Sequence, residues 1–498
     1  MLDQQNALTI LVCVITFMIT LFFYKHLWKR RRMPPGPLPL PILGNFLLIR
    51  SGGMVECLTK LAEKFGPVYT FYFGSSPTLI LTGYPTIKEA LVELGDAFTN
   101  RPSSPVLERM LRNGGLTLAN DETWSQLRLF SLTTLKDFGM GKKSLEEPLQ
   151  EEAKHLVDHF ARLNGEPVDP NNIVMFASSN VIANLLFGSR KDYDDKGWQK
   201  ILQDIRGSFQ LISSIWGQLY GIFPGIMYYL PGPHNKIFSL LKPLEDALEE
   251  MVRSHQKTLD PACPRDFIDC FLLRMKQEEK NVNTAFTLPN LESTIYDMFL
   301  AGAETTAITI SFGFLILAKY PEIQDKVHKE IDQVIGREKE PRADDRKHMQ
   351  YTIAFIHEMQ RYSDVMPLGA PRCTTKHVNF HGYSIPKGTE VLAMLTTVLR
   401  DPSQFEKPDE FYVNHFLDEN NTFKKNNAFM PLSAGKRACV AERLVIQELF
   451  IFFTFILQKF TLKSTVDPKD FDITPTESGF ENIPPHHKIQ FIARSLES

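Results

Sequence analysis

The sequence is organised around the stretch FMPLSAGKRACVAE at residues 429–442. It places Cys439 in a turn-rich loop directly before an amphipathic segment, and Lys436 and Arg437 add positive charge nearby. A thiolate at a helix start is stabilised by the positive end of the helix dipole and by backbone N–H groups without partners. A free cysteine is more commonly one more buried apolar residue. The loop alone leaves both interpretations open, so the rest of the chain must decide between them.

Length and composition narrow the classes of protein that remain. The chain has 498 residues, 43% of them hydrophobic, and a formal net charge of −3. This is ample apolar material for a core, and the near-neutral charge argues against nucleic acid as a partner. The six cysteines are scattered without C-x-x-C spacing. They predict neither a zinc site nor a disulfide framework, and they suit a reducing, cytosol-facing protein.

The N-terminus carries a candidate membrane anchor. Residues 7–24 form an apolar run without a charged residue, about the minimum length for a membrane-spanning helix. The basic cluster at 25–32 follows this run and no small-residue cleavage site precedes it, so an uncleaved anchor is favoured over a signal peptide. By the positive-inside rule, the chain beyond the anchor stays cytosolic. We divide the chain into an anchor at 1–24, a basic and proline-rich linker at 25–45, and one globular domain at 46–498.

The globular part reads as mainly helical with small β-sheets. Helical patterns dominate from Asp121 to about Phe460, with breaks at prolines, and no clean linker divides them. β-rich runs lie before this region and return after it. The expected helices include 56–65, 87–94, 121–136 and 289–319, and the expected strands include 68–73, 78–81, 378–383 and 390–395.

The predicted helix at 289–319 is apolar nearly all round in its central window FLAGAETTAITISF, residues 299–312. A second transmembrane helix is the obvious alternative. Against it, Glu304 and Thr305 stand at the centre of the window, where lipid would make an unpaired carboxylate costly. We therefore expect a buried acid–alcohol pair. Gly302 is expected to admit a flat ligand, and Thr305 to turn its hydroxyl to a carbonyl one turn back.

Two other predicted helices carry paired side chains at helical spacing. Trp124 and Arg128 are four residues apart, and Glu358 and Arg361 are three apart, so each pair shares one helical face. Exposed pairs of this kind are common and are worth about 0.5 kcal/mol or less. In isolation, packing or surface pairing is the better interpretation of both.

Residues 216–230, WGQLYGIFPGIMYYL, form an aromatic and aliphatic stretch between two helical segments. Core packing is the ordinary interpretation. After an anchor, such a stretch rimmed by Trp and Tyr is also suited to the membrane interface.

The ordered set of motifs resembles the cytochrome P-450 superfamily. The run FxxxSxGKRxC ending at Cys439 resembles its haem-binding loop, and AGxETT at 301–306 resembles its oxygen-activation helix. The pair Glu358 and Arg361 resembles its ExxR motif. The runs PPGPxPxPxxGN, FGMGKK, YLPGPH and SAGKRAC are similar to the vertebrate family-2 microsomal branch. The resemblance implies the cytochrome P-450 fold and makes 46–498 a haem-thiolate catalytic domain.

The resemblance also implies roles for individual residues. Cys439 would be the thiolate ligand of the iron of haem b. Glu304 and Thr305 would be the catalytic pair that delivers protons during oxygen activation. The residues implied to bind the haem propionates are Trp124, Arg128, Arg372 and Arg437. The residues implied to form a buried structural network are Glu358, Arg361 and His415. The residues implied to line an apolar substrate pocket are Val106, Leu116, Phe299, Ala301, Val365, Met366, Leu368 and Phe480, together with Thr305.

The implied activity is that of a membrane-anchored monooxygenase of the endoplasmic reticulum. It would use O2 to hydroxylate or epoxidise lipophilic small molecules such as xenobiotics, fatty acids or steroids. Electrons would come from NADPH through a reductase partner, with cytochrome b5 as a second candidate, because no dinucleotide or flavin fingerprint is evident. Basic residues could dock an acidic partner of this kind. These are Lys136, Lys142, Lys143, Lys424, Lys425 and Arg443.

Two departures from the family pattern keep alternatives open. Leu432 stands where an aromatic residue usually shields the thiolate, and Ala441 stands at a common glycine position, so altered haem affinity or redox poise is expected. One alternative is a haem-thiolate isomerase or dehydratase of lipid peroxides, against which Glu304 and Thr305 argue. The other is a non-catalytic haem-binding membrane protein. The substrate and the oligomeric state do not follow from the sequence.

Overall fold

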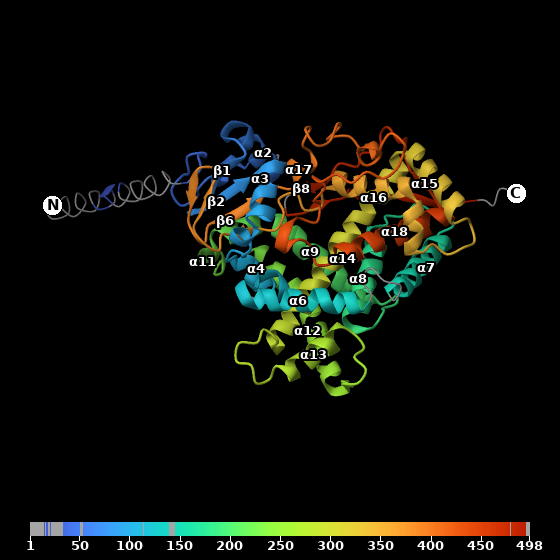
Figure 1. Ribbon diagram of the computed structural model, residues 1–498, viewed down its shortest axis with the longest axis horizontal. Coiled ribbons are helices and arrows are strands. Elements are labelled where there is room, and N and C mark those ends of the chain that lie inside the picture. The colour runs from blue at the N-terminus through green and yellow to red at the C-terminus, as the bar shows by residue number, and fades with distance from the viewer. Residues whose placement is uncertain are drawn as a thin grey trace. The chain divides into compact units, whose positions relative to one another are not determined.

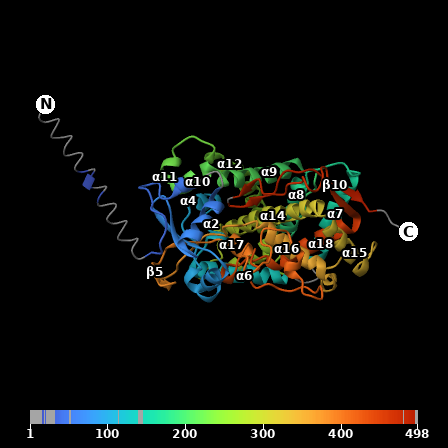
Figure 2. The ribbon, with the colours of Figure 1, turned by 90° about the horizontal axis from the view of Figure 1, so that it is seen from above.

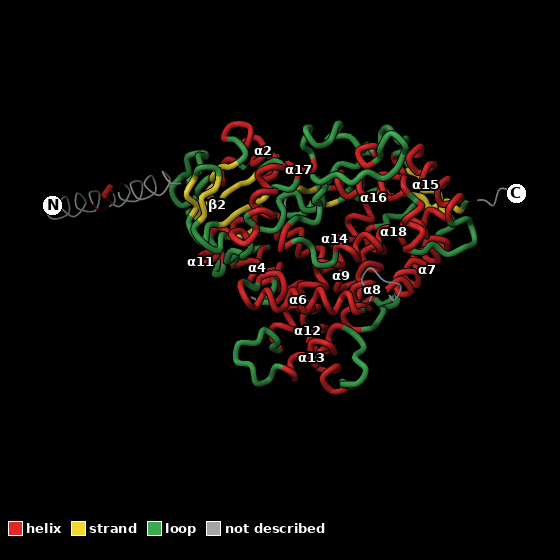
Figure 3. The backbone as a smooth tube through the Cα atoms, viewed as in Figure 1, coloured by secondary structure: helices red, strands yellow, loops and turns green. Residues whose placement is uncertain are grey.

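The computed structural model describes residues 14, 16, 17, 20, 33–49, 53–112, 114–138, 145–478 and 480–494. The expected anchor, its basic flank, and Lys142 and Lys143 lie outside these ranges, apart from the four isolated positions near the N-terminus. The described chain forms two compact units, 1–102 with 371–393 and 103–370 with 394–498. Each unit is mainly helical or mixed with small sheets, as the sequence predicted (Figure 3). The domain boundaries drawn from the sequence stay predictions.

The first unit is built on a four-stranded sheet with strand order β1-β2-β6-β3. Its strands are β1 (Val68–Phe73), β2 (Ser76–Leu81), β3 (Arg372–Cys373) and β6 (Glu390–Ala393). The antiparallel pairing of β1 and β2 brings Phe73 opposite Ser76, so the turn is only two residues long. Gly74 opens this turn with a φ of 61°, which favours glycine. The strands predicted over 68–73 and 78–81 are confirmed, and β2 begins two residues earlier than expected because Ser76 and Pro77 already pair with β1. The strand predicted over 390–395 ends at Ala393.

Short elements complete the first unit. They are η1 (Phe46–Leu48), α2 (Gly53–Phe65), α3 (Tyr84–Lys88), the π-helix η2 (Glu89–Glu93), η3 (Gly95–Phe98), β4 (Val378–Phe380) and β5 (Tyr383–Ile385). The single strand predicted over 378–383 is wrong, because the chain reverses within it. His381 and Gly382 have φ values of 50° and 81°, which is the two-residue hairpin turn that matches the twist of paired strands.

The second unit holds the long helices. Those before the central helix are α4 (Pro105–Met110), α5 (Gly115–Leu118), α6 (Asp121–Asp137), α7 (Glu146–Arg162), α8 (Asn171–Phe187), α9 (Lys196–Ser213), α10 (Ile215–Ile222), α11 (Pro224–Met227), α12 (His234–Thr258) and α13 (Phe267–Gln277). The later ones are α14 (Leu288–Lys319), α15 (Pro321–Val334), η5 (Ala343–His348), α16 (Gln350–Ser363), α17 (Thr396–Leu399), η6 (Val413–Phe416), η7 (Gly435–Arg437) and α18 (Glu442–Lys459). Two antiparallel pairs join β7 (Phe460–Ser464) to β10 (Ile489–Ala493) and β8 (Glu477–Ser478) to β9 (Asn482–Ile483).

Helix α14 is the core of the second unit. It has 32 residues, so it is roughly 48 Å long at 1.5 Å per residue. Thr287 caps its N-terminus by accepting from Asn290 N–H, and proline stands in its first turn. α14 runs between α8 and α9 on one side and α16 and α18 on the other (Figures 1 and 2). It is the one described helix long and apolar enough to cross a membrane, but 83% of its apolar window is buried in protein, so it is a core helix.

Candidate functional site

The cysteine loop is a tight turn that ends at the start of α18. Ser433 and Gly435 have φ values of 65° and 72°, and Cys439 N–H donates to Leu432 O over 3.0 Å, which closes the loop. Burial raises the pKa of the Cys439 thiol, whereas a hydrogen bond from the backbone of Ala441 lowers it. Ala441 has a φ of −99°, so a residue other than glycine is accommodated there without backbone strain. In these apolar surroundings a thiolate requires a cation beside it.

Arg437 fastens the loop to the segment between α5 and α6. Its guanidinium lies 4.0 Å from the ring centre of Trp124 and donates to Ala119 O over 2.6 Å and to Leu116 O over 3.3 Å. The side chain is buried. Arg437 therefore positions the cysteine loop through bonds within the protein, whether or not it also contacts a cofactor.

Trp124 and Arg128 retain donors that the described protein does not use. The indole N–H of Trp124 has no hydrogen-bond partner among the described residues, and Arg128 donates only to Ala438 O, over 2.8 Å. Burial lowers the pKa of Arg128. A buried carboxylate would complete both side chains, because each presents N–H groups to an acceptor. A haem would supply what these groups lack. Its iron would be the cation beside the Cys439 thiolate, and its propionates would accept from Trp124 and Arg128.

One short face of α14 is not covered by protein. Every residue from Ser293 to Ala318 is buried except Ala301, Gly302 and Thr305. Ala301 and Thr305 are one turn apart, and Thr305 Oγ1 donates to Ala301 O over 2.7 Å, as the sequence predicted. The open face therefore presents a methyl group and a hydroxyl that can rotate to another acceptor.

On the side to which a Cβ would point, Gly302 packs against α8. A Cβ at Gly302 would lie 3.1 Å from Ile182 Cγ1 on α8. Its missing side chain lets α8 and α14 pack closely, and the approach of a flat ligand to Gly302 stays a prediction.

Glu304 is buried and bonded to a residue that the sequence analysis did not single out. Arg206 Nε on α9 donates to Glu304 Oε1 over 3.3 Å. Burial raises the pKa of Glu304, and Arg206 opposes this. Burial and the charge of Glu304 also raise the pKa of Glu481 well above its usual range. The available signal was that Arg206 lies beside Ile205 and Phe209, on the apolar stripe of an amphipathic helix.

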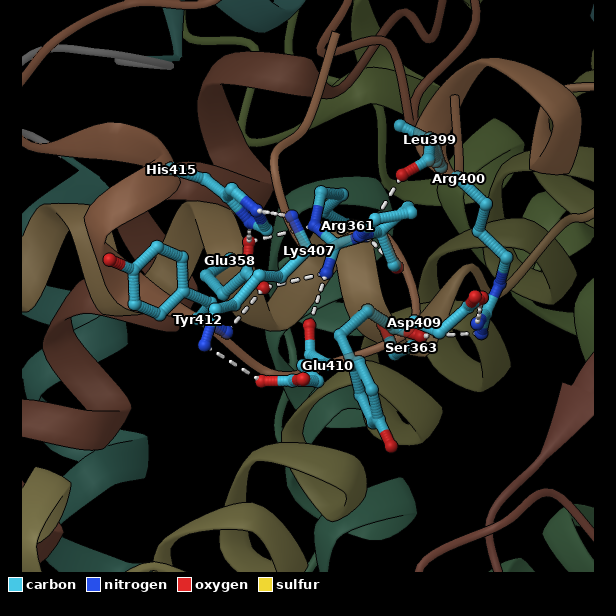
Figure 4. Close-up of polar contacts among 12 residues, drawn as sticks. Glu358, Arg361, Ser363, Leu399, Arg400, Lys407, Asp409, Glu410, Tyr412 and His415 are labelled. Atoms are coloured by element: carbon cyan, nitrogen blue, oxygen red, sulfur yellow. Dashed lines mark hydrogen bonds and ion pairs between the residues drawn. The ribbon is translucent and has the colours of Figure 1, made fainter. Parts of the chain in front are cut away.

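The predicted structural network is present around α16 (Figure 4). Arg361 donates to both oxygens of Glu358 over 2.8 and 2.7 Å, and to three backbone carbonyls over 2.9, 2.6 and 2.7 Å. His415 Nδ1 lies 3.0 Å from Glu358 Oε2, and its Nε2 lies 3.1 Å from Lys407 N. Because the Lys407 amide is a donor, Nε2 accepts and Nδ1 carries the proton, so the ring is neutral.

The expected pocket residues fall on several segments of the second unit. Phe480 stacks on Phe209 of α9, and Asn482 N–H donates to Val365 O over 3.0 Å, which joins the segment after α16 to the β8–β9 turn. Val106 packs in an apolar cluster with Tyr220 and Met227. Those expected residues that are half-buried are Val365, Met366 and Phe480, and Leu368 and Leu116 are buried.

Phe299 is not on the open face of α14. It is fully buried and contacts Trp198 and Phe187 with ring centres 5.5 and 6.2 Å away. A side chain two positions before Ala301 points almost to the opposite side of the helix. The prediction that Phe299 lines the same pocket as Ala301 is therefore not supported by its packing.

Arg372 lies buried on β3 of the first unit, in register with Val391. It belongs to a different unit from Trp124, Arg128 and Arg437, and its predicted role stays a prediction.

A second cluster contains side chains of the kinds that bind metal ions, but these side chains are already engaged in hydrogen bonds within the protein. His255 Nδ1 lies 2.7 Å from Met251 O and its Nε2 lies 2.7 Å from Asp266 Oδ2, so both ring nitrogens donate. Arg265 binds both oxygens of Asp269 over 2.6 and 2.9 Å. Burial lowers the pKa of His255, but the bond to Asp266 outweighs it and the pKa is raised. An imidazolium has no lone pair for a metal, so this is an ion-pair cluster.

Comparisons with known proteins agree with the site. The family described as Cytochrome P450 matches residues 34–491. The chain is 46% identical over 494 residues to cytochrome P450 2G1 of Oryctolagus cuniculus, covering 99% of this chain and 100% of that protein. It is 45% identical over 484 residues to cytochrome P450 2C23 of Rattus norvegicus, covering 97% and 98%. It is 46% identical over 453 residues to cytochrome P450 2F2 of Mus musculus, covering 91% and 92%.

Proposed function

Since this chain belongs to the cytochrome P450 family and is a P450 monooxygenase, we propose that it oxidises lipophilic small molecules at the open face of α14, with Cys439 as the thiolate ligand of haem b. The resemblance to the superfamily and to its family-2 branch, predicted from the motifs, is confirmed by these relatives. When bound, the haem supplies the activation of O2 and the transfer of one oxygen atom to the substrate.

The observation that carries the proposal is the interruption of burial on α14. Ala301 and Thr305 are accessible on a helix that is buried on both sides of them, and Glu304 lies buried beside Thr305. An apolar helix face with one hydroxyl suits a lipophilic substrate with few polar groups.

The protein's own residues would divide the work. Trp124 and Arg128 would bind propionates with the donors that the protein leaves unused. Thr305 would donate its hydroxyl hydrogen once it leaves Ala301 O, and Glu304 would hold and give up a proton because burial favours its neutral form. Arg437 would hold the cysteine loop in position, with Arg372 as a further propionate candidate.

Electron delivery would use a separate reductase that takes electrons from NADPH, with cytochrome b5 as an additional donor. Among the basic residues expected to dock such a partner, the described ones are exposed, which supports this role. They are Lys136, Lys424, Lys425 and Arg443.

We also propose a single-pass anchor in the endoplasmic reticulum membrane, with the catalytic domain on the cytosolic side. Residues 215–230, which include α10 and α11, support contact with lipid, because several of their large apolar side chains face solvent. The most exposed are Ile226 at 63%, Tyr228 at 59% and Tyr229 at 81%. Trp216 is 39% exposed, so quenching of its fluorescence by lipid-borne quenchers measures this contact.

The proposal is tested by the difference spectrum of the dithionite-reduced, carbon-monoxide-bound protein. Wild type and Cys270→Ser, which changes another half-buried cysteine, should both give a thiolate-type Soret band, and Cys439→Ser should lose it. A reconstituted system with reductase, NADPH and an alkoxycoumarin probe should then form oxygenated product. A histidine-type band in wild type would overturn the assignment of Cys439, and a thiolate band without any product would favour the isomerase or the non-catalytic alternative.

A further inference from the structure

Helix α16 ends in a backbone conformation that needs support from elsewhere in the chain. Asp364, the residue after its last turn, has φ and ψ of 44° and 51°, a left-handed conformation that is uncommon for residues other than glycine. Ser363 and Asp364 are 1% and 2% exposed, so water has little access to their backbone. The last carbonyl groups of a helix have no partner within it, and buried ones therefore require another donor.

Asn482 of β9 supplies this donor from 118 positions away. Its Nδ2 donates to Asp364 O over 2.8 Å and to Ser363 O over 3.4 Å, and its backbone N–H donates to Val365 O over 3.0 Å. Three consecutive carbonyls of the chain leaving α16 thus bond to one residue, which is itself buried. Asn482 Oδ1 is also buried and has no hydrogen-bond partner among the described residues, so the side chain serves as a donor only.

The three hydrogen bonds of Asn482 join two segments that carry expected pocket residues. Val365 and Met366 follow directly on the bonded end of α16. Phe480 stands two positions before Asn482, and its ring stacks on Phe209 of α9 with ring centres 6.1 Å apart. The position of Phe480 relative to Val365 and Met366 therefore depends on how β9 is held against the end of α16.

The segment between α16 and α17 is held at two places along its length. Asn482 bonds to its start, and Thr396 N–H of α17 donates to Pro367 O over 3.0 Å farther along. Within the segment, Gly369 N–H donates to Met366 O over 2.9 Å. Loss of the bonds to Asn482 would free the start of this segment, where Met366 lies, while the bond from Thr396 keeps the rest in place.

We propose that Asn482 is a specificity-determining positioning residue, which fixes the spacing between residues 365–366 and Phe480 and thereby selects the atom of a substrate that is oxidised. The inference rests on the proposed function, in which both segments line the substrate pocket. Asn482 bonds to backbone carbonyls, so it acts through the residues beside it. An apolar pocket orients its ligand largely by shape, and a displacement of about 1 Å is enough to change reactivity strongly.

Hydrogen–deuterium exchange of the holoenzyme tests the three hydrogen bonds without turnover. Asn482→Leu keeps a side chain of similar size and removes both side-chain donors, so residues 363–369 and 480–483 should exchange about tenfold faster than in wild type. Asn482→Ala serves the same purpose if leucine prevents folding. Unchanged exchange at 363–369 would overturn the proposal.

Gln458→Met is the matched control. Gln458 is buried at the end of α18, and its Nε2 likewise donates to two backbone carbonyls, Gly336 O over 2.7 Å and Lys339 O over 2.8 Å. None of these three residues is expected to line the pocket. This variant should speed exchange in the loop after α15 and leave residues 363–369 as in wild type.

The ratio of two products from one alkoxycoumarin probe separates positioning from a merely structural role. Hydroxylation of the alkoxy carbon gives a hemiacetal that breaks down to the hydroxycoumarin and an aldehyde, whereas hydroxylation of the ring retains the alkoxy group. Asn482→Leu should change this ratio by about fivefold, and Gln458→Met should keep the wild-type ratio. A wild-type ratio in Asn482→Leu, despite faster exchange, would overturn the role in specificity.

Two nitrogen ligands of haem iron distinguish failure of this inference from failure of the proposed function. Imidazole is small, whereas 4-phenylimidazole also extends toward the pocket walls. Asn482→Leu should change the Kd of 4-phenylimidazole by about fivefold and leave that of imidazole unchanged, as measured by the shift of the Soret band. Equal changes for both ligands, or none, would overturn the inference. If wild type forms no coumarin product, the proposed monooxygenase function fails, and the two Kd values still decide whether Asn482 shapes the pocket.

Discussion

The second unit contains two buried acid–arginine pairs that differ in how completely they are bonded. In the pair of Glu358 and Arg361, all five guanidinium N–H donors have acceptors, and both carboxylate oxygens receive hydrogen bonds (Figure 4). In the pair of Glu304 and Arg206, one carboxylate oxygen has no partner among the described residues, and a water-sized cavity adjoins it.

The difference separates a structural role from a chemical one. A fully satisfied network holds its charges and protons in one arrangement, so it can join distant segments but has nothing to exchange. An incompletely satisfied carboxyl beside a cavity can gain or lose a proton at small structural expense. We therefore expect the same residue types to brace α16 and, in the proposed function, to exchange a proton at α14.

Arg361→Lys should give the largest effect. Lysine has three donors in place of five, so at least two of the acceptors would be left unpaired in the core. We expect the free energy of unfolding to fall by about 3–5 kcal/mol, with loss of haem on purification. Chemical denaturation of the holoenzyme measures this. The matched control is Arg265→Lys, which changes a bidentate arginine that is 44% exposed and should cost far less.

Glu304→Gln should leave the fold intact and remove function. Product formation should fall about 100-fold, because a buried general acid is lost, whereas the unfolding free energy should fall by less than in Arg361→Lys, because Arg206 keeps its bonds to Asn172 Oδ1 and Asn171 O. Steady-state rates and denaturation on the same preparation measure both. A loss of stability as large as that of Glu358→Gln would break the contrast between the two pairs.

Glu448→Gln sharpens the comparison, since Glu448 is buried without an arginine. Burial raises its pKa to about 8, from about 4.3 in an unfolded chain. The neutral Glu448 carboxyl therefore makes its full contribution to the free energy of unfolding below about pH 4, and this contribution is lost as the pH rises to about 8. In the Glu448→Gln variant, the Tm should fall less steeply than in wild type over this pH range, and the rate of probe oxidation should not change. Glu442→Gln, exposed on the same helix, should keep the wild-type slope.

His415→Ala should give the smallest change. The ring accepts from Lys407 N–H and donates to Glu358. Its removal therefore leaves the Lys407 amide and the Glu358 carboxylate each without one hydrogen bond. A decrease of about 1–2 kcal/mol in unfolding free energy is expected. Chemical denaturation of the variant and of wild type measures this decrease. A loss as large as that of Arg361→Lys would show that the histidine, and not the arginine, holds the network together.

Much of the local structure was predictable from short-range patterns. Proline in the first turn of α14 and α15, the two strands after α2, and the hydroxyl of Thr305 directed to Ala301 O all follow from chemistry within a few residues. The prediction failed where helical spacing was interpreted without the other helices that pack against α14. Phe299 packs on Trp198, because α9 occupies that face of α14.

By itself, the sequence determined the family, the position of the cysteine loop and the composition of each helix, since these depend on residue types at short spacing. Only the tertiary structure decided which charges meet. Arg206 and Glu304 are 98 positions apart. No helical or strand periodicity connects such positions. Their contact depends on how α9 and α14 pack, and the same packing determines which carboxyl oxygens are left without a donor.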